Sequence, residues 1–364
     1  ILQEEQVPYD KGYIQAPYMG LVLEDTDQVQ KYFMQDEFTK TAFGKLDIRT
    51  QKEIQGAVMT LYKALTDGQG MPVEGEDGGY KKGEIYTSWV SGEKYDDDGN
   101  RETDRNGGAG PCKTPHWIDH IPVGYYVLEE SVCPYEQGYV QSKDMNIHIE
   151  ETGRVQSFEM EEDFTAIEIL KYDTKSREAL YKDSPAWLTL YKAKLDEQGN
   201  PVMEQGIPQG DERERIFTFR APGYEDGQRV AATGRVTPDA AGERPIMKYD
   251  YEVHRIPNTI QGRYYYTENA AVRIEYLPVG SYVLTETGTP AGYATAPSLL
   301  IQVQDKGHVE QIQSFQMGDE PLKVQVSKTD AAGSGEVKGA RMAVYPVDQS
   351  GKPEDSPLMI HRPC

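Results

Sequence analysis

The sequence predicts an all-β chain built from tandem copies of one unit. Three observations lead to this prediction: a composition rich in turn-forming residues, short segments that alternate apolar and polar residues, and an internal repeat. Among the 364 residues there are 35 Gly, 22 Pro and 25 Tyr, whereas hydrophobic residues make up only 37%. This balance suits strands joined by many turns better than it suits helices.

The chain is strongly acidic, with 38 Lys and Arg against 60 Asp and Glu and a formal net charge of −22. Because such a surface repels phosphate backbones and anionic lipids, we expect neither nucleic acid nor a membrane as partner. No apolar run is long enough to span a bilayer. No phosphate-binding loop, nucleophile elbow or dinucleotide fingerprint is present, so we expect no cofactor and no turnover catalysis. We interpret the chain as a fragment whose targeting signals are absent or were cut away.

Three kinds of segment recur along the chain. One has Pro followed by Gly-Tyr and later Met-x-acid, and occurs at 8–36, 134–162 and 290–319. The second begins with Lys-x-Asp and occurs at 45–57, 171–186 and 328–340. The third is Pro-Val-Gly-x-Tyr-Val-Leu-x-Glu and occurs at 122–130 and 278–286. The separation of Lys45 from Lys171 equals that of Asp36 from Glu162. One domain is therefore repeated in tandem.

These repeats divide the chain into two whole units and two partial ones. The whole units are 38–163 and 164–320, while 1–37 is the end of a preceding unit and 321–364 is the beginning of a following one. Almost no linker separates the units, so we expect a stiff array. The stretches 64–118 and 193–262 are predicted to carry long insertions.

Strand parity places ionisable side chains on the inner faces, because residues two apart share a face. Lys171 lies on the face of Ile167 and Ile169, Glu286 on that of Leu284, and Asp319 on that of Met317. Strand parity thus predicts that Lys45, Glu130 and Glu162 point into the core of the first unit, and that Lys171, Glu286 and Asp319 point into the core of the second. In the last, partial unit, Lys328 shares the inner face of its strand with Leu322, Val324 and Val326.

Three buried charges in one core must pair, lose their charge or react. Desolvation favours a neutral amine beside a protonated acid. A neutral lysine amine attacks a carboxyl carbon, a second carboxyl shuttles protons, and loss of water leaves an amide. A buried salt bridge without reaction is the other interpretation, and the residues alone leave both open.

The motifs closely resemble those of Cna protein B-type repeats, the prealbumin-like, inverse Ig-like β-sandwiches of Gram-positive adhesins and SpaA-like pilins. The resemblance rests on Lys171-x-Asp173, on Gly280-x-Tyr282-x-Leu284-x-Glu286 and on Met317-x-Asp319. It implies a spontaneous isopeptide bond between Lys171 and Asp319, with Glu286 as its catalyst. It also implies a stalk segment of a cell wall-anchored surface protein, which contacts its neighbouring repeats and holds a tip for an unknown extracellular ligand.

The first unit departs from the family pattern at one position. Lys45 and the catalyst position Glu130 match, but the acceptor is Glu162, one methylene longer than Asp. This difference counts against a cross-link in the first unit. Asp36 and Lys328 also match the motifs, and we expect their partners upstream and downstream of this sequence.

Weaker signals concern the cysteines and one acidic turn. Cys112 and Cys133 fall in one unit, where a disulfide is one interpretation. Together with His116 and His120 they invite a zinc interpretation, but the spacing fits no established zinc motif. The acidic run 96–98 is better explained as a solvated turn than as a calcium loop. We therefore predict no metal site.

The alternative function is a glycan- or protein-binding module of an adhesin that acts through the inserted loops. Its candidate sugar-stacking residues are Trp89, Trp117, Tyr264, Tyr265 and Tyr266. Exposure of these aromatic side chains would favour the alternative, and burial would count against it.

Overall fold

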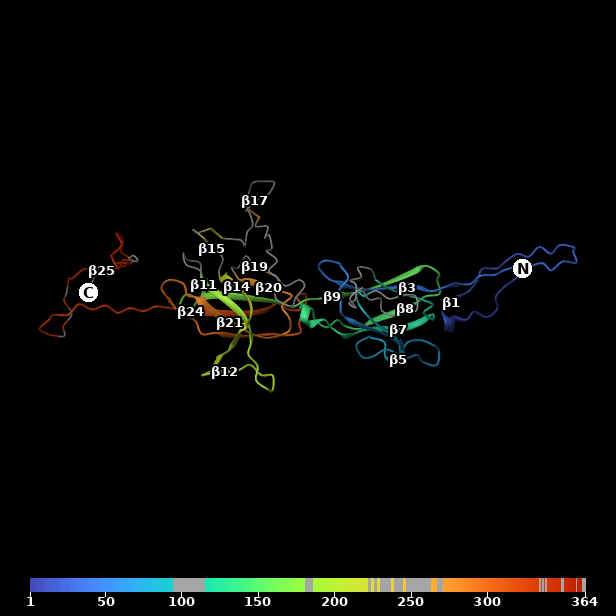
Figure 1. Cartoon of the computed structure of the whole chain (residues 1–364), viewed down its shortest axis with the longest axis horizontal. Coiled ribbons are helices and arrows are strands. Elements are labelled where there is room, and N and C mark those ends of the chain that lie inside the picture. The colour runs from blue at the N-terminus through green and yellow to red at the C-terminus, as the bar shows by residue number, and fades with distance from the viewer. Residues whose placement is uncertain are drawn as a thin grey trace. The chain divides into compact units, whose positions relative to one another are not determined.

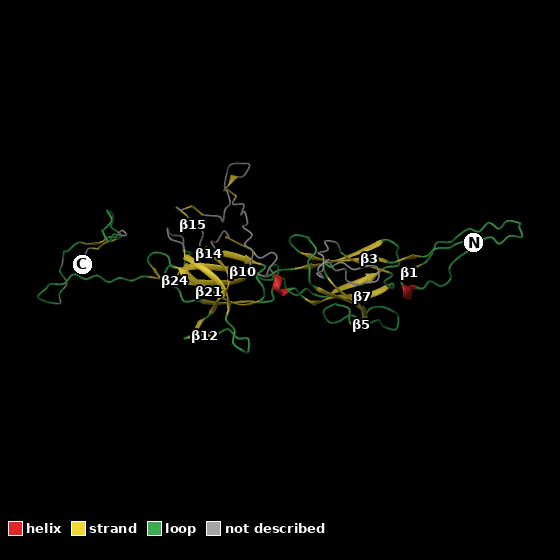
Figure 2. Ribbon diagram, in the orientation of Figure 1, coloured by secondary structure: helices red, strands yellow, loops and turns green. Residues whose placement is uncertain are grey.

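The structure is a computed structural model that describes residues 1–93, 115–180, 186–221 and 271–333, most of 335–361, and five short strands between 224 and 266. Its described residues form two compact units, 1–291 with 295–320, and 292–294 with 321–364. Strands dominate the larger unit (Figures 1 and 2), which confirms the predicted all-β class, whereas the described residues of the smaller unit hold only short strands. In the described part of the chain, the helical elements are the short 3-10 turns η1 (Tyr9–Lys11) and η2 (Tyr135–Gln137), and none is long and apolar enough to cross a membrane.

The first sandwich, as we call residues 38–163, consists of two packed sheets. One sheet has the order β6-β3-β9 and the other the order β5-β4-β7-β8. The strands are β3 (Lys40–Asp47), β4 (Val58–Ala64), β5 (Lys82–Val90), β6 (His116–Asp119), β7 (Gly124–Val132), β8 (Met145–Ile149) and β9 (Val155–Glu162). Strand β9 runs parallel to β3.

The core of the first sandwich lies between these sheets. Phe43 of β3 and Met160 of β9 face Leu61 of β4, Leu128 of β7 and Ile147 of β8, and all five side chains are buried. Alternation along each strand sends these side chains inward. Their burial removes apolar surface from water, which is the main stabilising term for the sandwich.

The second sandwich, residues 164–320, repeats this plan. One sheet has the neighbours β19-β20-β10-β24, and the other has the order β14-β11-β21-β23. The strands are β10 (Ala166–Asp173), β11 (Ala186–Ala193), β14 (Gly210–Ala221), β19 (Arg263–Tyr266), β20 (Val272–Glu275), β21 (Gly280–Gly288), β23 (Leu299–Val303) and β24 (Gln313–Pro321). Strand β24 runs parallel to β10, as β9 does to β3.

The two stretches predicted as insertions also supply framework strands. Strand β5 lies within 64–118 and pairs with β4, while β14 lies within 193–262 and pairs with β11. Short hairpins accompany β14, namely β12 (Met203–Glu204) with β13 (Ile207–Pro208), β15 (Tyr224–Glu225) with β16 (Gln228–Arg229), and β17 (Thr237–Pro238) with β18 (Pro245–Ile246). Each long stretch therefore completes a sheet.

A third apolar cluster joins the two sandwiches. It combines Ile54, Cys133 and Tyr139 of the first sandwich with Phe164 and Tyr276 of the second. The rings of Phe164 and Tyr276 stack with their centroids 4.0 Å apart. We call this cluster the junction core.

The chain ends carry few strands in the described residues. Strand β1 (Tyr13–Ile14) pairs with β2 (Glu37–Phe38), and β25 (Met342–Val344) pairs with β26 (Met359–His361), while β22 (Tyr293–Ala294) lies in the smaller unit.

The prediction of a strand over 322–326 is wrong. This segment has no strand, and Leu322 and Val324 are 60% and 73% exposed. The described residues offer it no neighbouring strand, and an apolar face without a partner is not stable as a strand. Lys328 is exposed instead of facing a core, and Asp36 is exposed as well.

Candidate functional site

Three ionisable side chains meet in the core of the second sandwich. Lys171 comes from β10, Glu286 from β21 and Asp319 from β24, and their side chains are fully buried. Lys171 Nζ lies 3.1 Å from Glu286 Oε1 and forms an ion pair with Asp319 Oδ1. The structure thus brings together the three residues that strand parity and the family resemblance select.

Parallel pairing explains why Lys171 reaches Asp319. In the β10–β24 register Lys171 lies opposite Met317, and Asp173 lies opposite Asp319. Lys171 and Asp319 are therefore diagonal neighbours on the same face of one sheet. Glu286 approaches from the opposing sheet, where it lies beside Leu188 of β11.

Two donors outside the triad fix the orientation of Glu286. The Ala296 backbone N–H donates to Glu286 Oε2 at 2.7 Å, and the Thr289 hydroxyl donates to the same oxygen at 3.4 Å. The other oxygen, Oε1, is thereby left facing Lys171. Sequence reasoning missed both residues, and in the case of Ala296 the reason is that a backbone donor leaves no signal in residue type.

Burial raises the pKa of Asp319, and the neighbouring Glu286 carboxyl adds to the effect, although Lys171 opposes it. A protonated carboxyl is a better electrophile than a carboxylate, and a lysine that gives up its proton becomes a nucleophile. The geometry is therefore suited to amide formation, with Glu286 placed to carry protons.

The first sandwich has an equivalent buried triad. Lys45 of β3 forms an ion pair with Glu162 of β9, and its Nζ lies 3.5 Å from Oε1 of Glu130 on β7. The three side chains are at most 1% exposed. Burial and the adjacent Glu130 raise the pKa of Glu162 against the opposing effect of Lys45. The longer acceptor side chain still contacts the lysine.

Ser142 is an additional polar residue of the first triad that sequence reasoning missed. Its backbone N–H donates to Glu130 Oε2 at 2.9 Å, as Ala296 does to Glu286. Its hydroxyl accepts a hydrogen bond from Lys45 Nζ at 2.7 Å. The second site has Ala296 in this place and so lacks the hydroxyl.

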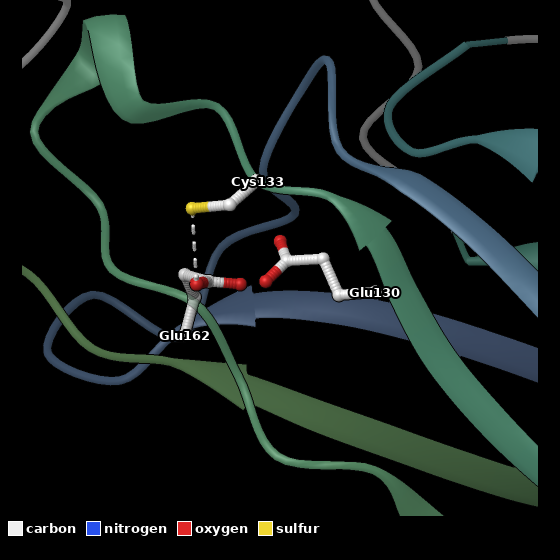
Figure 3. A group of neighbouring side chains, drawn as sticks. All are labelled: Glu130, Cys133 and Glu162. Carbon is white, nitrogen blue, oxygen red and sulfur yellow. Dashed lines mark hydrogen bonds between the residues drawn. The ribbon is translucent and has the colours of Figure 1, made fainter. Parts of the chain in front are cut away.

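Cys133 lies against the first triad (Figure 3), and its thiol donates a weak hydrogen bond to Glu162 Oε1 at 3.9 Å. Burial and the nearby acids raise the pKa of the Cys133 thiol. Glu130, Cys133 and Glu162 are close enough to share a metal ion. However, the Lys45 ammonium already contacts Glu162 and lies near Glu130, so this set of residues fits a divalent cation poorly.

The structure does not bring together the described members of the zinc interpretation. His116 stacks on Trp89 with centroids 4.7 Å apart, and His120 stacks on Phe38 at 4.1 Å, away from the Cys133 group. Cys133 has a free thiol in the structure. Its predicted disulfide partner Cys112 lies outside the described residues, as does the acidic run 96–98.

The aromatic residues of the alternative function divide between core and surface. Trp89 is 4% exposed and belongs to the core of the first sandwich, which counts against a stacking role. Trp117 on β6 is 54% exposed. Tyr264, Tyr265 and Tyr266 form part of β19, but their side chains lie outside the described set. A sugar-stacking platform is therefore not favoured.

Comparison with known proteins identifies the fold family of the first sandwich. Residues 39–163 match the model of the SpaA family, described as a prealbumin-like fold domain. The first sandwich is SpaA-like. This match confirms the predicted resemblance to SpaA-like pilin domains and the prealbumin-like fold, and it supports a pilin-like structural role. The comparison with curated proteins yields no significant match.

Several solved structures match the chain over most of its length, at low sequence identity and low TM-score. The Bacillus anthracis TIE protein is 16% identical with a TM-score of 0.30, and the alignment covers 90% of this chain but only 44% of that one. The shaft pilin SpaA from Lactobacillus rhamnosus GG is 11% identical with a TM-score of 0.26 and coverage of 79% and 99%. The minor pilin GBS52 of Streptococcus agalactiae is 10% identical with a TM-score of 0.22 and coverage of 80% and 100%. Because these TM-scores are low, the fold assignment rests on the sheet topology and on the family match, and not on these structures.

His116 gives the first sandwich a predicted pH dependence. Burial lowers its pKa from 6.5 to about 4. Because the folded-state pKa lies below the unfolded one, the stability that His116 contributes is present above pH 6.5 and is lost as the pH falls toward 4. We expect the thermal midpoint to fall less between pH 7 and pH 4 in His116→Phe than in the unmodified chain.

The matched control is His148→Phe, since His148 is an exposed histidine that also stacks on an aromatic ring, that of Tyr125. This variant should follow the unmodified chain across the same pH range. Equal falls in the His116 variant and the unmodified chain would show that burial of His116 does not contribute.

Proposed function

We propose that this chain is a stalk segment of an extracellular pilin-like or adhesin protein on a Gram-positive cell wall, stabilised by a Lys171–Asp319 isopeptide bond. The observation that carries the proposal is the contact of Lys171 with both Asp319 and Glu286 in a fully buried site. The parent protein would bind its extracellular ligand elsewhere, while this segment contacts neighbouring repeats.

The reaction is a condensation that happens once in each site. The neutral Lys171 amine attacks Asp319 Cγ and forms the C–N bond. Glu286 accepts a proton from the nitrogen and delivers a proton to the departing oxygen, so the C–O bond breaks and one water leaves. Glu286 returns to its starting state, and the chain performs no turnover on an external substrate.

Topology gives the bond a mechanical purpose. Strands β10 and β24, at the start and end of the second sandwich, are parallel neighbours. Tension on the chain pulls on these two strands, and a covalent bond between them keeps the sandwich from unravelling. The same bond closes a long loop and so restricts the unfolded chain.

Peptide mapping tests this proposal. After denaturation and digestion, we expect a branched peptide that contains Lys171 and Asp319 and lacks the mass of one water. Fragmentation should place the branch at these two residues, and Lys171→Arg should abolish it. Recovery of both segments only as separate linear peptides would refute the isopeptide function.

A further inference from the structure

We propose that the first sandwich also closes its triad, as a Lys45–Glu162 amide, and that the second sandwich is needed to seal this site. The inference rests on the proposed chemistry of the second site and extends it to a glutamate acceptor. In this proposal the second sandwich positions the reacting groups of the first sandwich without contributing a reacting group itself.

The reach of Glu162 supports closure. Lys45 lies opposite Met160 and Asp47 lies opposite Glu162, which is the same two-residue offset as in the second sandwich. The extra methylene of Glu162 is accommodated, because the carboxyl contacts Lys45 Nζ and lies within 3.3 Å of the Ser142 hydroxyl. The acceptor therefore sits beside the nucleophile despite its greater length.

The surrounding donors orient the other carboxyl for proton transfer. Glu130 Oε2 accepts hydrogen bonds from the Ser142 backbone at 2.9 Å and from the Gln141 side chain at 3.3 Å. Its Oε1 makes no hydrogen bond and faces Lys45 Nζ at 3.5 Å. Glu130 thus has the place in the first site that Glu286 has in the second.

The proposed step balances in atoms and charge. A proton passes from the Lys45 ammonium to a carboxylate, and the free amine attacks Glu162 Cδ. The C–N bond forms, Glu130 moves a proton from nitrogen to the departing oxygen, and the C–O bond breaks with release of one water. Burial, which raises the pKa of Glu162, favours the neutral pair from which this step starts.

The second sandwich covers the end of this site through the junction core. Phe164 and Tyr276 pack in one apolar cluster with Cys133, whose thiol contacts Glu162. The Tyr276 hydroxyl donates to buried Asp47, the register partner of Glu162, at 2.8 Å. Exclusion of water from Glu162 therefore depends on side chains of the neighbouring sandwich.

Gly138 offers a means to disturb the junction alone. Its φ is +82°, and a Cβ at this position would collide with the backbone carbonyl of Tyr276. Gly292 has a similar φ of +87°, but a Cβ there would meet nothing within 4 Å. Gly138→Ala and Gly292→Ala thus impose the same backbone strain, and only the first one pushes the sandwiches apart.

Peptide mapping of the full chain tests the inference at each site separately. In the unmodified chain we expect both the Lys45–Glu162 and the Lys171–Asp319 branched peptides. In Gly138→Ala we expect the first link to form about 100-fold more slowly, as for a misplaced reacting pair, and the second link to persist. Gly292→Ala should retain both links.

The outcomes separate this inference from the proposed function. A Lys171–Asp319 link without any Lys45–Glu162 link in the unmodified chain would overturn the inference and leave the proposed function standing. Normal closure of the first site in Gly138→Ala would overturn the sealing role. The milder variant Tyr276→Phe, which removes only the hydroxyl on Asp47, should also slow the first link, and the intact second link shows that the second sandwich is folded.

Discussion

Replacing Glu286 with Gln is expected to leave Lys171 and Asp319 unjoined and to lower the free energy of unfolding of the second sandwich by about 5 kcal/mol. The two cross-linked residues are 148 positions apart, so the bond removes a large loop entropy from the unfolded chain. The glutamine amide has nearly the same shape as the Glu286 carboxyl group, but it does not accept a proton from the lysine nitrogen and pass it to the departing oxygen. Hydrogen exchange of the β10 and β21 amides, followed by mass spectrometry, measures the loss.

The control for this prediction is Glu178→Gln, the same chemical change at an exposed residue of the second sandwich. This variant should keep the cross-link and the exchange protection of the unmodified chain. A Glu286→Gln chain with a complete Lys171–Asp319 link would exclude Glu286 as the proton carrier.

Asp47→Ala is expected to destabilise the junction between the sandwiches by about 3–5 kcal/mol. Asp47 is fully buried and accepts hydrogen bonds from the hydroxyls of Tyr139 at 3.0 Å and Tyr276 at 2.8 Å. It also accepts from the backbone N–H groups of Arg49 and Thr50. The alanine removes the acceptor shared by all four donors.

A double-mutant cycle with Tyr276→Phe checks whether the effect passes through the junction. We expect the tyrosine substitution to cost less in the Asp47→Ala background than alone, because the two residues share one hydrogen bond. Asp196→Ala, which removes an exposed aspartate that caps a turn, should cost less than Asp47→Ala. Full additivity of Asp47→Ala and Tyr276→Phe would contradict the proposed coupling.

The sequence allowed prediction of the all-β class and of the membership of both buried triads. Period-two alternation determines which side chains face the core, so Lys171, Glu286 and Asp319 could be assigned to one interior without coordinates. The same alternation assigned Lys45, Glu130 and Glu162 to the interior of the first unit. These are local properties of strands, which a single sequence contains.

Features that depend on contacts between distant segments could not be predicted. Ser142 enters the first site through its backbone N–H as well as its hydroxyl. Asp47 and Tyr276 meet across 229 positions of sequence. The failed strand at 322–326 has the same origin, because its alternation is correct but the partner that would stabilise it is not among the described residues.

The measurement that tests the central claim most directly is the intact mass of the chain under denaturing and reducing conditions. We predict that the unmodified chain is lighter than its calculated mass by two waters, one for each sandwich. Lys171→Ala and Lys45→Ala should each be lighter by one water. An unmodified chain with its full calculated mass would contradict the account, since both triads would then be buried ion pairs that do not react.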